Sequence, residues 1–216
     1  MTECQCDGVG TRFDEAYAAE KLARYRSAGP DPSTQMLIDL VAEEDIQGLT
    51  LLDIGGGVGA VQHGLIERGV ARALEVEASP SNAAACAAEA ERQGHGERVT
   101  HLSGDFASVS RHVEPADIVT LDRSVCCWHD PLGLIDQSAA KARWLYAVVY
   151  PRDAWWVRHV WRHFGNLKQI LKRNSLRLST PRSKDVEATL AEHGLSLAHH
   201  REMGVWQIAL FAKDVH

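Results

Sequence analysis

LTLLDIGGGVGA, residues 49–60, joins a short apolar run to a cluster of glycines. The apolar run ends at Asp53 and predicts a buried strand, and residues 61–67 after the cluster are typical of a helix. The cluster has four members, which are Gly55, Gly56, Gly57 and Gly59. A strand, a glycine turn and a helix N-terminus let the backbone approach a ligand closely, because no Cβ stands in the way. The stretch therefore predicts a cofactor-binding turn.

Two cofactors compete for this turn. Gly55, Gly57 and Ala60 satisfy the spacing of the dinucleotide pattern, and the acidic Glu77 lies about 20 residues beyond it. S-adenosylmethionine has no phosphate and carries a cationic ammonium and a cationic sulfonium. We expect Asp53 to repel a pyrophosphate and to favour these cations, because charges interact strongly in a dry site. S-adenosylmethionine is thus the favoured cofactor, while a nicotinamide-dependent oxidoreductase and a non-catalytic S-adenosylmethionine-binding module remain alternatives.

The rest of the chain alternates apolar strands with helices. This alternation predicts a doubly wound, mostly parallel α/β sheet of seven strands. The predicted strands are residues 49–54, 71–76, 98–102, 117–121, 144–150, 195–201 and 205–212. The predicted helices are residues 12–27, 34–44, 61–67, 80–93, 131–142, 154–172 and 183–193. The last two strands form a hairpin at Gly204, so we expect one C-terminal strand to run antiparallel, which the dinucleotide fold usually lacks.

Four motifs resemble, in this order, those of the class I S-adenosylmethionine-dependent methyltransferases. They are LLDIGGGVG at residues 51–59, LEVEASP at 74–80, GDF at 104–106 and ADIVTLD at 116–122. The resemblance covers roughly residues 35–212, and it implies a Rossmann-like fold with S-adenosylmethionine as cofactor and S-adenosylhomocysteine as product. The motif order and the basic C-terminal half are also similar to those of magnesium protoporphyrin methyltransferases, which implies a large, flat, dicarboxylic acceptor.

The resemblance also implies a set of cofactor-binding residues. In that family, the residue matching Glu77 holds the ribose hydroxyls, and the residue matching Asp105 accepts a hydrogen bond from the adenine amino group. Phe106 is expected to pack on the adenine ring. The complete set is Asp53, Gly55, Gly56, Gly57, Gly59, Glu77, Ala78, Asp105, Phe106, Asp122 and Arg123.

Residues 122–130 follow the fourth strand, and ligands of open α/β sheets bind beyond the carboxyl ends of the strands. His129 is the first candidate base, since an unperturbed imidazole has a pKa of about 6.5, although a loop or helix-capping role is equally open. Asp122 ends the strand, where it touches a ligand or forms an ion pair with Arg123. Tyr25, on the N-terminal helix, completes the catalytic candidates.

Aromatic and basic residues supply the candidates for substrate binding, which are Tyr17, Trp128, Trp155 and Arg158. Residues 151–184 carry nine Lys or Arg and one acid. We expect a basic aromatic helical insert at residues 154–184, which packs in the core, roofs a pocket for a flat acidic molecule or lies on a membrane interface. Residues 1–48 are expected to form an N-terminal helical cap or lid, and residues 49–216 the S-adenosylmethionine-binding domain.

Composition sets further limits. The 216 residues fit one domain, and the net charge of −6 disfavours nucleic acid as a partner. We find no signal peptide and no run of about 18 apolar residues, and the five cysteines favour a reducing cytoplasm. No metal site is expected, because the cysteines considered, Cys4, Cys6, Cys126 and Cys127, lack the C-x₂-C spacing. We expect a small-molecule acceptor and leave the oligomeric state open.

Overall fold

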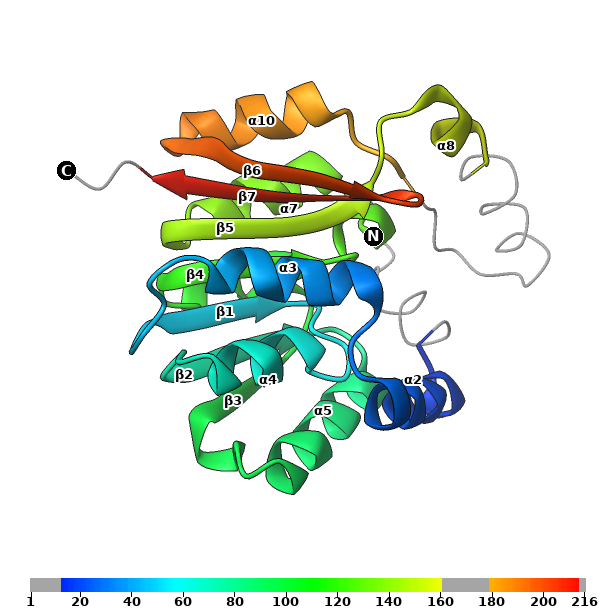
Figure 1. Cartoon of the computed structure of the whole chain (residues 1–216), viewed down its shortest axis with the longest axis vertical. Helices are drawn as coiled ribbons and strands as arrows, with labels where there is room; N and C mark the ends of the chain where they lie inside the picture. The colour runs from blue at the N-terminus through cyan, green and yellow to red at the C-terminus, as the bar shows by residue number, and fades with distance from the viewer. Residues whose placement is uncertain (1–12, 161–178, 214–216) are drawn as a thin grey trace.

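The computed structural model describes residues 13–160 and 179–213. Its seven-stranded sheet has the order β3-β2-β1-β4-β5-β7-β6 (Figure 1). The strands are β1 Thr50–Ile54, β2 Arg72–Glu77, β3 Val99–Ser103, β4 Ala116–Asp122, β5 Ala142–Pro151, β6 Leu195–Met203 and β7 Trp206–Lys213. The pairs from β3 to β5 are parallel, whereas β7 runs antiparallel to β5 and β6. The predicted mostly parallel sheet with an antiparallel strand from the C-terminal hairpin is confirmed.

The two central strands, β1 and β4, carry apolar residues at most of their positions. Most of their residues are buried, as expected for parallel strands that are covered on both faces. The strand order reverses here, because β1 is followed in the sheet by β2 on one side and by β4 on the other. The carboxyl ends of β1 and β4 therefore border the crevice in which doubly wound sheets bind their ligands.

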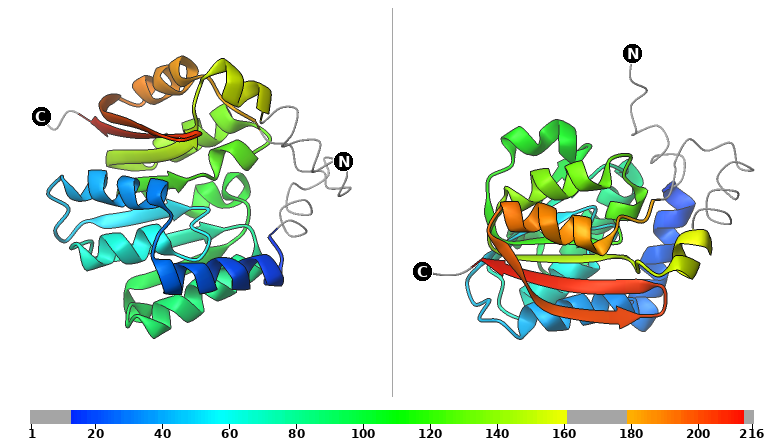
Figure 2. Two further views of the ribbon diagram at one scale, coloured as in Figure 1. Left: turned by 45° about the vertical axis from the view of Figure 1, so that its right-hand side comes forward. Right: turned by 90° about the horizontal axis from the view of Figure 1, so that it is seen from above.

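Helices cover both faces of the sheet (Figures 1 and 2). One face carries α3 (Pro32–Ala42), α4 (Ala60–Glu67) and α5 (Pro80–Arg92), and the other carries α6 (Phe106–Val109), α7 (Pro131–Ala139) and α10 (Ser183–Glu192). Each face has its own hydrophobic core, with Leu37 and Leu65 in the first and Leu134 and Val186 in the second. This three-layer packing buries the apolar stripe of each of these helices.

Four short helices were not predicted. They are α6 and the 3-10 helices η1 Gly96–Arg98, η2 Ser110–His112 and η3 Val125–Cys127. A single turn gives no repeat of apolar residues, so periodicity cannot reveal it.

The helix α2 (Glu15–Ala28) lies beside α5, at the edge where the parallel strands end (Figure 2). Asp14 begins it by accepting a hydrogen bond from the backbone N–H of Tyr17 at 2.9 Å, and Gly29 ends it with a φ of 75°. Arg26 donates to Glu89 of α5 at 2.8 Å. This ion pair fixes α2 against the body of the protein.

The packing of α3 differs from that of α2. Leu37, Ile38 and Val41 of α3 are fully buried, and the helix lies against β5, β7 and α4. Of the helices in residues 13–48, α2 is the one in the position of a cap. The division into a cap and a binding domain stays a prediction.

The predicted basic insert falls mostly on residues 161–178, which lie outside the described residues. Its described beginning is α8 (Trp155–Val160), where the side chains of Trp155 and Trp156 are 75% and 40% exposed. Within residues 13–160 and 179–213, no helix has both the length and the apolar character needed to cross a membrane.

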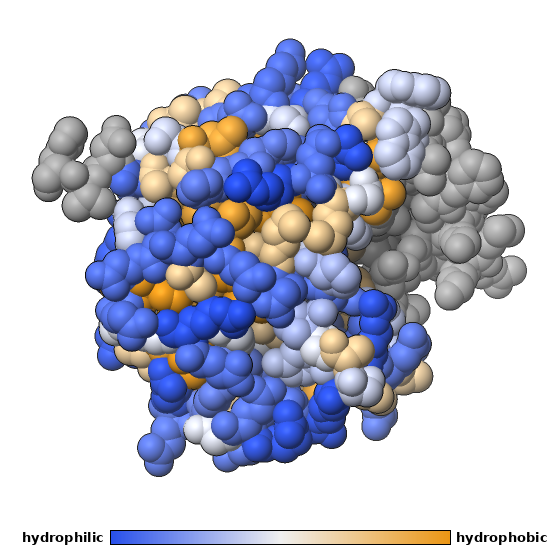
Figure 3. Space-filling model, in the orientation of Figure 1, coloured by the Kyte–Doolittle hydropathy of each residue, from blue (hydrophilic) through white to orange (hydrophobic). Residues whose placement is uncertain are grey.

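The face that carries α3 has a largely hydrophilic described surface (Figure 3). Apolar residues gather between α3 and β6. The edge strand β6 has mostly exposed residues, among them Leu197 at 44%, and α10 packs against it. The end of the sheet formed by β6 is therefore the less covered one.

Candidate cofactor and substrate site

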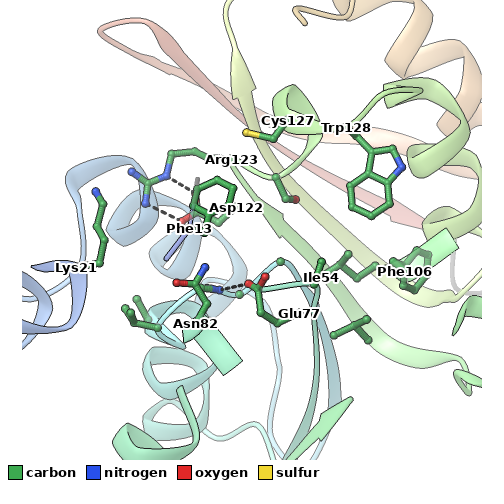
Figure 4. Close-up of a pocket in the computed structure, with 18 of the residues that line it drawn as sticks. Phe13, Lys21, Ile54, Glu77, Asn82, Phe106, Asp122, Arg123, Cys127 and Trp128 are labelled. Atoms are coloured by element: carbon green, nitrogen blue, oxygen red, sulfur yellow. Dashed lines mark hydrogen bonds and ion pairs between the residues drawn. The ribbon is translucent and has the colours of Figure 1, made fainter. Parts of the chain in front are cut away.

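A cavity of about 330 Å³ opens at the carboxyl ends of β1, β2 and β4 (Figure 4). Three segments form most of its wall: the glycine turn after β1, the end of β2 with the first turn of α5, and the residues after β4. Side chains of α2 and Trp206 at the start of β7 complete the wall. The cavity therefore occupies the crevice that the strand order defines.

The glycine turn presents its backbone to the cavity. Gly55, Gly56 and Gly57 all line it. Gly57 has a φ of 64°, and no described atom lies within 4 Å of the position that a Cβ would take, so its peptide is open to a ligand. At Gly56 there is no room for a Cβ, because that atom would stand 2.6 Å from Oδ2 of Asp53. Gly59 lies outside the wall, buried at the N-cap of α4.

Glu77 ends β2 and directs its carboxylate toward the cavity (Figure 4). Oε1 accepts from the backbone N–H of Ser79 at 2.7 Å, and Oε2 accepts from the backbone N–H of Gly57 at 3.1 Å. The side chain of Asn82 hydrogen-bonds the same carboxylate. Burial raises the pKa of Glu77 to about 7 against the effect of these hydrogen bonds. The carboxylate is held in place with acceptor capacity left for a ligand that donates hydrogen bonds.

Asp53 does not line the cavity, contrary to its expected place at the mouth of the turn. Its side chain is fully buried beneath the turn, where Oδ1 accepts from Oγ1 of Thr120 at 2.7 Å. Alternation along β1 sends Ile54 to the cavity and Asp53 away from it. Burial raises the pKa of Asp53 to about 8, so the carboxyl group is mostly neutral at pH 7. The geometry therefore gives no support to a repulsion of phosphate by Asp53.

Asp122 and Arg123, at the end of β4, both line the cavity. Arg123 has a φ of 56°, and its guanidinium donates to Asp31 at 2.6 Å and to Asp122 at 3.2 Å. Thr34 donates to Oδ2 of Asp122 at 2.7 Å. Burial alone would lower the pKa of Arg123, but the two carboxylates raise it. This network joins the start of α3 to the end of β4 and holds both side chains in position.

Aromatic side chains and thiols form much of the remaining wall. Phe106, which is buried, and Trp128 reach it from the loops after β3 and β4. Phe13, just before α2, and Tyr17 of α2 also reach it, and their rings meet edge to face with centroids 5.1 Å apart. The wall also includes Lys21, Cys126, Cys127 and Trp206.

Several predicted residues lie away from the cavity wall. His129 is exposed in the loop before α7, and Trp155 is exposed on α8. Tyr25 lies against α5, where its hydroxyl accepts from Gln93 at 3.3 Å. Asp105 caps α6 by accepting from the backbone N–H of Ala107 at 2.9 Å. The side chain of Arg158 is outside the described part of the structure.

The wall residues that were not predicted include Lys21, Asn82 and Trp206. Lys21 belongs to the same face of α2 as Tyr17, so helical spacing from Tyr17 could have found it. Asn82 stands in the first turn of the helix that follows Glu77, and a count from the acid would have found it. Trp206 comes from β7, whose pairing places it opposite Pro151 at the end of β5. No local pattern signals that pairing.

Comparisons with known proteins agree with this arrangement. Residues 52–140 match the family model of a methyltransferase domain. No curated protein matches the chain in sequence. Among solved structures, the chain is similar to magnesium protoporphyrin IX methyltransferase from Synechocystis PCC 6803 with bound S-adenosylhomocysteine, with 17% identity, a TM-score of 0.69 and coverage of 95% of this chain and 98% of that chain.

Two further structures show the same fold. An O-methyltransferase family protein from Burkholderia thailandensis has a TM-score of 0.72 at 15% identity, over 94% of this chain and 61% of that chain. A putative RNA methyltransferase from Pyrococcus horikoshii has a TM-score of 0.62 at 16% identity, over 85% of each chain.

Proposed function

We propose that the chain is a class I S-adenosylmethionine-dependent methyltransferase, and that it methylates a small, flat, aromatic acceptor that carries an anionic group. The observation that supports the proposal is the composition of the cavity. Backbone, an acid and an amide line one end, while rings and cations line the rest. The acceptor is expected to bind among the rings.

Glu77 and the glycine turn are assigned to the cofactor. The open peptide at Gly57 admits a ligand to the backbone, and the carboxylate of Glu77 is placed to accept hydrogen bonds from the two ribose hydroxyls. Phe106 offers a ring face for the adenine. S-adenosylmethionine, when bound, supplies an electrophilic methyl group and a neutral thioether leaving group.

Trp128 and Trp206 are assigned to the acceptor. Large rings bury much area at little entropic cost, and they suit a planar molecule. Lys21 also lines the cavity and offers a cation for an anionic substituent of the acceptor. Of the three predicted catalytic residues, Asp122 is the one that lines the cavity, and we assign to it the positioning of the acceptor. We also propose that the partner is a small molecule rather than a nucleic acid. The proposed location is the cytoplasm, whose reducing conditions suit the thiols of Cys86, Cys126 and Cys127.

The test has two stages. A thermal-shift assay compares S-adenosylhomocysteine with NADH, and only the former is expected to stabilise the protein. Transfer of labelled methyl from S-adenosylmethionine is then measured to a panel of flat aromatic acids, a magnesium porphyrin and transfer RNA. Label in an aromatic acid or the porphyrin supports the proposal. Label in RNA alone, or binding of cofactor with no transfer to any flat acceptor, overturns it.

The second candidate for the methyl acceptor is a trivalent compound that binds thiols, such as arsenite. The Sγ atoms of Cys126 and Cys127 lie 3.8 Å apart, and both residues line the cavity. Arsenite titration, followed through the fluorescence of the adjacent Trp128, tests it. Stoichiometric quenching that disappears in Cys127→Ser favours this candidate, and no quenching removes it.

A further inference from the structure

A second cluster of reactive side chains lies behind the glycine turn. Glu75 of β2, Cys86 of α5 and His101 of β3 each offer one ligand atom, and these atoms lie within 4.8 Å of one another. Glu75 and Cys86 are buried, and none of the three residues lines the cavity. The methyltransferase chemistry therefore gives these groups no direct task.

Two buried polar atoms at this cluster lack hydrogen-bond partners among the described residues. They are Oε1 of Glu75 and Nε2 of His63, and the latter residue is 0% exposed. The other oxygen of Glu75 lies 2.6 Å from Nδ1 of His101. An unpaired buried polar atom costs on the order of 1–3 kcal/mol. Two of them beside a thiol and an imidazole indicate a ligand that the side chains themselves do not supply.

The glycine turn lies directly beside the cluster. A Cβ on Gly59 would stand 2.8 Å from Sγ of Cys86, from Nε2 of Gln62 and from Nε2 of His63. Nε2 of Gln62 donates to Sγ of Cys86 at 2.8 Å, and Nδ1 of His63 lies 3.1 Å from Nδ1 of His95. His63 is thus a neighbour of Cys86, but its nitrogens do not belong to the group of ligand atoms that lie within 4.8 Å of one another.

We propose that Glu75, Cys86 and His101 bind one Zn²⁺ ion. A thiolate, an imidazole and a carboxylate are all ligands that Zn²⁺ accepts in tetrahedral geometry. On binding, the S–H bond of Cys86 breaks, a Zn–S bond forms, and the proton leaves to solvent. Three protein ligands leave the fourth position to a water molecule. The cysteines that were considered from the sequence play no part in it.

The three ligands come from three different elements. Glu75 belongs to β2, Cys86 to α5 and His101 to β3. A metal ion would join these elements directly behind the glycine turn, because Sγ of Cys86 lies 2.8 Å from the point at which a Cβ on Gly59 would stand. Zn²⁺ is therefore expected to raise the melting temperature of the protein and to tighten its hold on the cofactor.

The test uses the full chain, stripped with a chelator and titrated with Co²⁺ as a coloured substitute for Zn²⁺. One equivalent is expected to bind with a thiolate-to-cobalt charge-transfer band, and Zn²⁺ is expected to displace it. Cys86→Ser should remove the band and weaken binding at least about 100-fold. The double variant Cys126→Ser and Cys127→Ser is the matched control and should titrate like the parent.

The outcomes separate clearly. Absence of stoichiometric uptake by the parent chain overturns the site, and so does a Cys86→Ser variant that titrates like the parent. Circular dichroism and S-adenosylhomocysteine binding show whether each variant is folded. Should Cys86→Ser fail to fold, His101→Gln takes its place, because the side chain of His101 is 24% exposed and tolerates replacement. Retained tight binding in that variant counts against the proposal.

Discussion

The two ends of the cavity are built in different ways. At the end that we assign to the cofactor, most of the wall is backbone and one acid from a single strand-turn-helix-strand segment, Thr50–Glu77, to which Asn82 and Phe106 add their side chains. At the acceptor end, the wall is made of side chains from α2, from the loop after β4 and from β7, which are far apart in the sequence. Cofactor binding therefore depends on a few local positions with little freedom to change. Acceptor choice depends on side chains that can vary while the fold stays the same.

The largest expected effect is at the cofactor end, in Glu77→Ala. We expect the affinity for S-adenosylhomocysteine to fall about 100-fold, because the hydrogen bonds of a charged acceptor to two hydroxyls are lost. Isothermal titration calorimetry measures it. Glu97→Ala is the control, since Glu97 is an exposed acid in η1. An affinity for Glu77→Ala within threefold of the parent would remove Glu77 from the cofactor site.

At the acceptor end, Trp128→Ala is expected to lower kcat/KM for the acceptor about 10-fold, through the loss of ring stacking. The affinity for S-adenosylhomocysteine should stay within about threefold, because Trp128 is assigned to the acceptor. Steady-state kinetics and calorimetry measure the two quantities. Trp155→Ala is the matched control, since Trp155 is 75% exposed and outside the wall. Equal losses of cofactor and acceptor binding would show that the two ends are not separate.

The attachment of α2 gives a smaller effect. Glu89 is buried between Arg26 and Arg92, and the hydrogen bond from Arg92 holds the pKa of Glu89 at about 2. The carboxylate stabilises the fold above its unfolded pKa of about 4.3, and this stability is lost as the pH falls toward 2. Glu89→Gln should lower the free energy of unfolding by about 1–2 kcal/mol at pH 7, after allowance for the exposure of the arginines.

Urea unfolding at pH 7 and at pH 3 measures the Glu89 effect. The difference between parent and variant should shrink at pH 3, because the Glu89 carboxyl group of the unfolded parent, with a pKa of about 4.3, is then mostly protonated. Asp39→Asn is the control, since Asp39 forms an exposed pair with Arg68 at 3.0 Å and should change stability by no more than about 0.5 kcal/mol. A difference that stays constant with pH would exclude the ionised Glu89 as its source.

The smallest effect is expected in Asp53→Asn. Asp53 lies beneath the turn and outside the cavity wall, so the affinity for S-adenosylhomocysteine should change by less than about threefold. Calorimetry beside Glu77→Ala makes the comparison. A loss of 10-fold or more would place Asp53 in contact with the cofactor, as its position next to the glycines first indicated.

The glycine turn and Glu77, which the sequence assigned to the cofactor, line one cavity for a physical reason. They belong to neighbouring strands, and a parallel pair brings their carboxyl ends together at one edge. Two of the predicted catalytic residues lie away from the cavity wall. His129 and Tyr25 were chosen by residue type and approximate position, but the direction of a side chain in a loop or on a helix follows from packing. The same holds for Trp206, whose place depends on the β5–β7 pairing.

By itself, the sequence determined the order of strands and helices, the parallel sheet and the glycine turn that lines the cavity, because apolar periodicity and glycine conformation act over a few residues. The tertiary structure decided which side chains meet. It turned Asp53 away from the cavity, brought Trp206 into it, and gathered Glu75, Cys86 and His101 behind the turn. Such contacts depend on helix packing and strand pairing between distant segments, which no local pattern encodes.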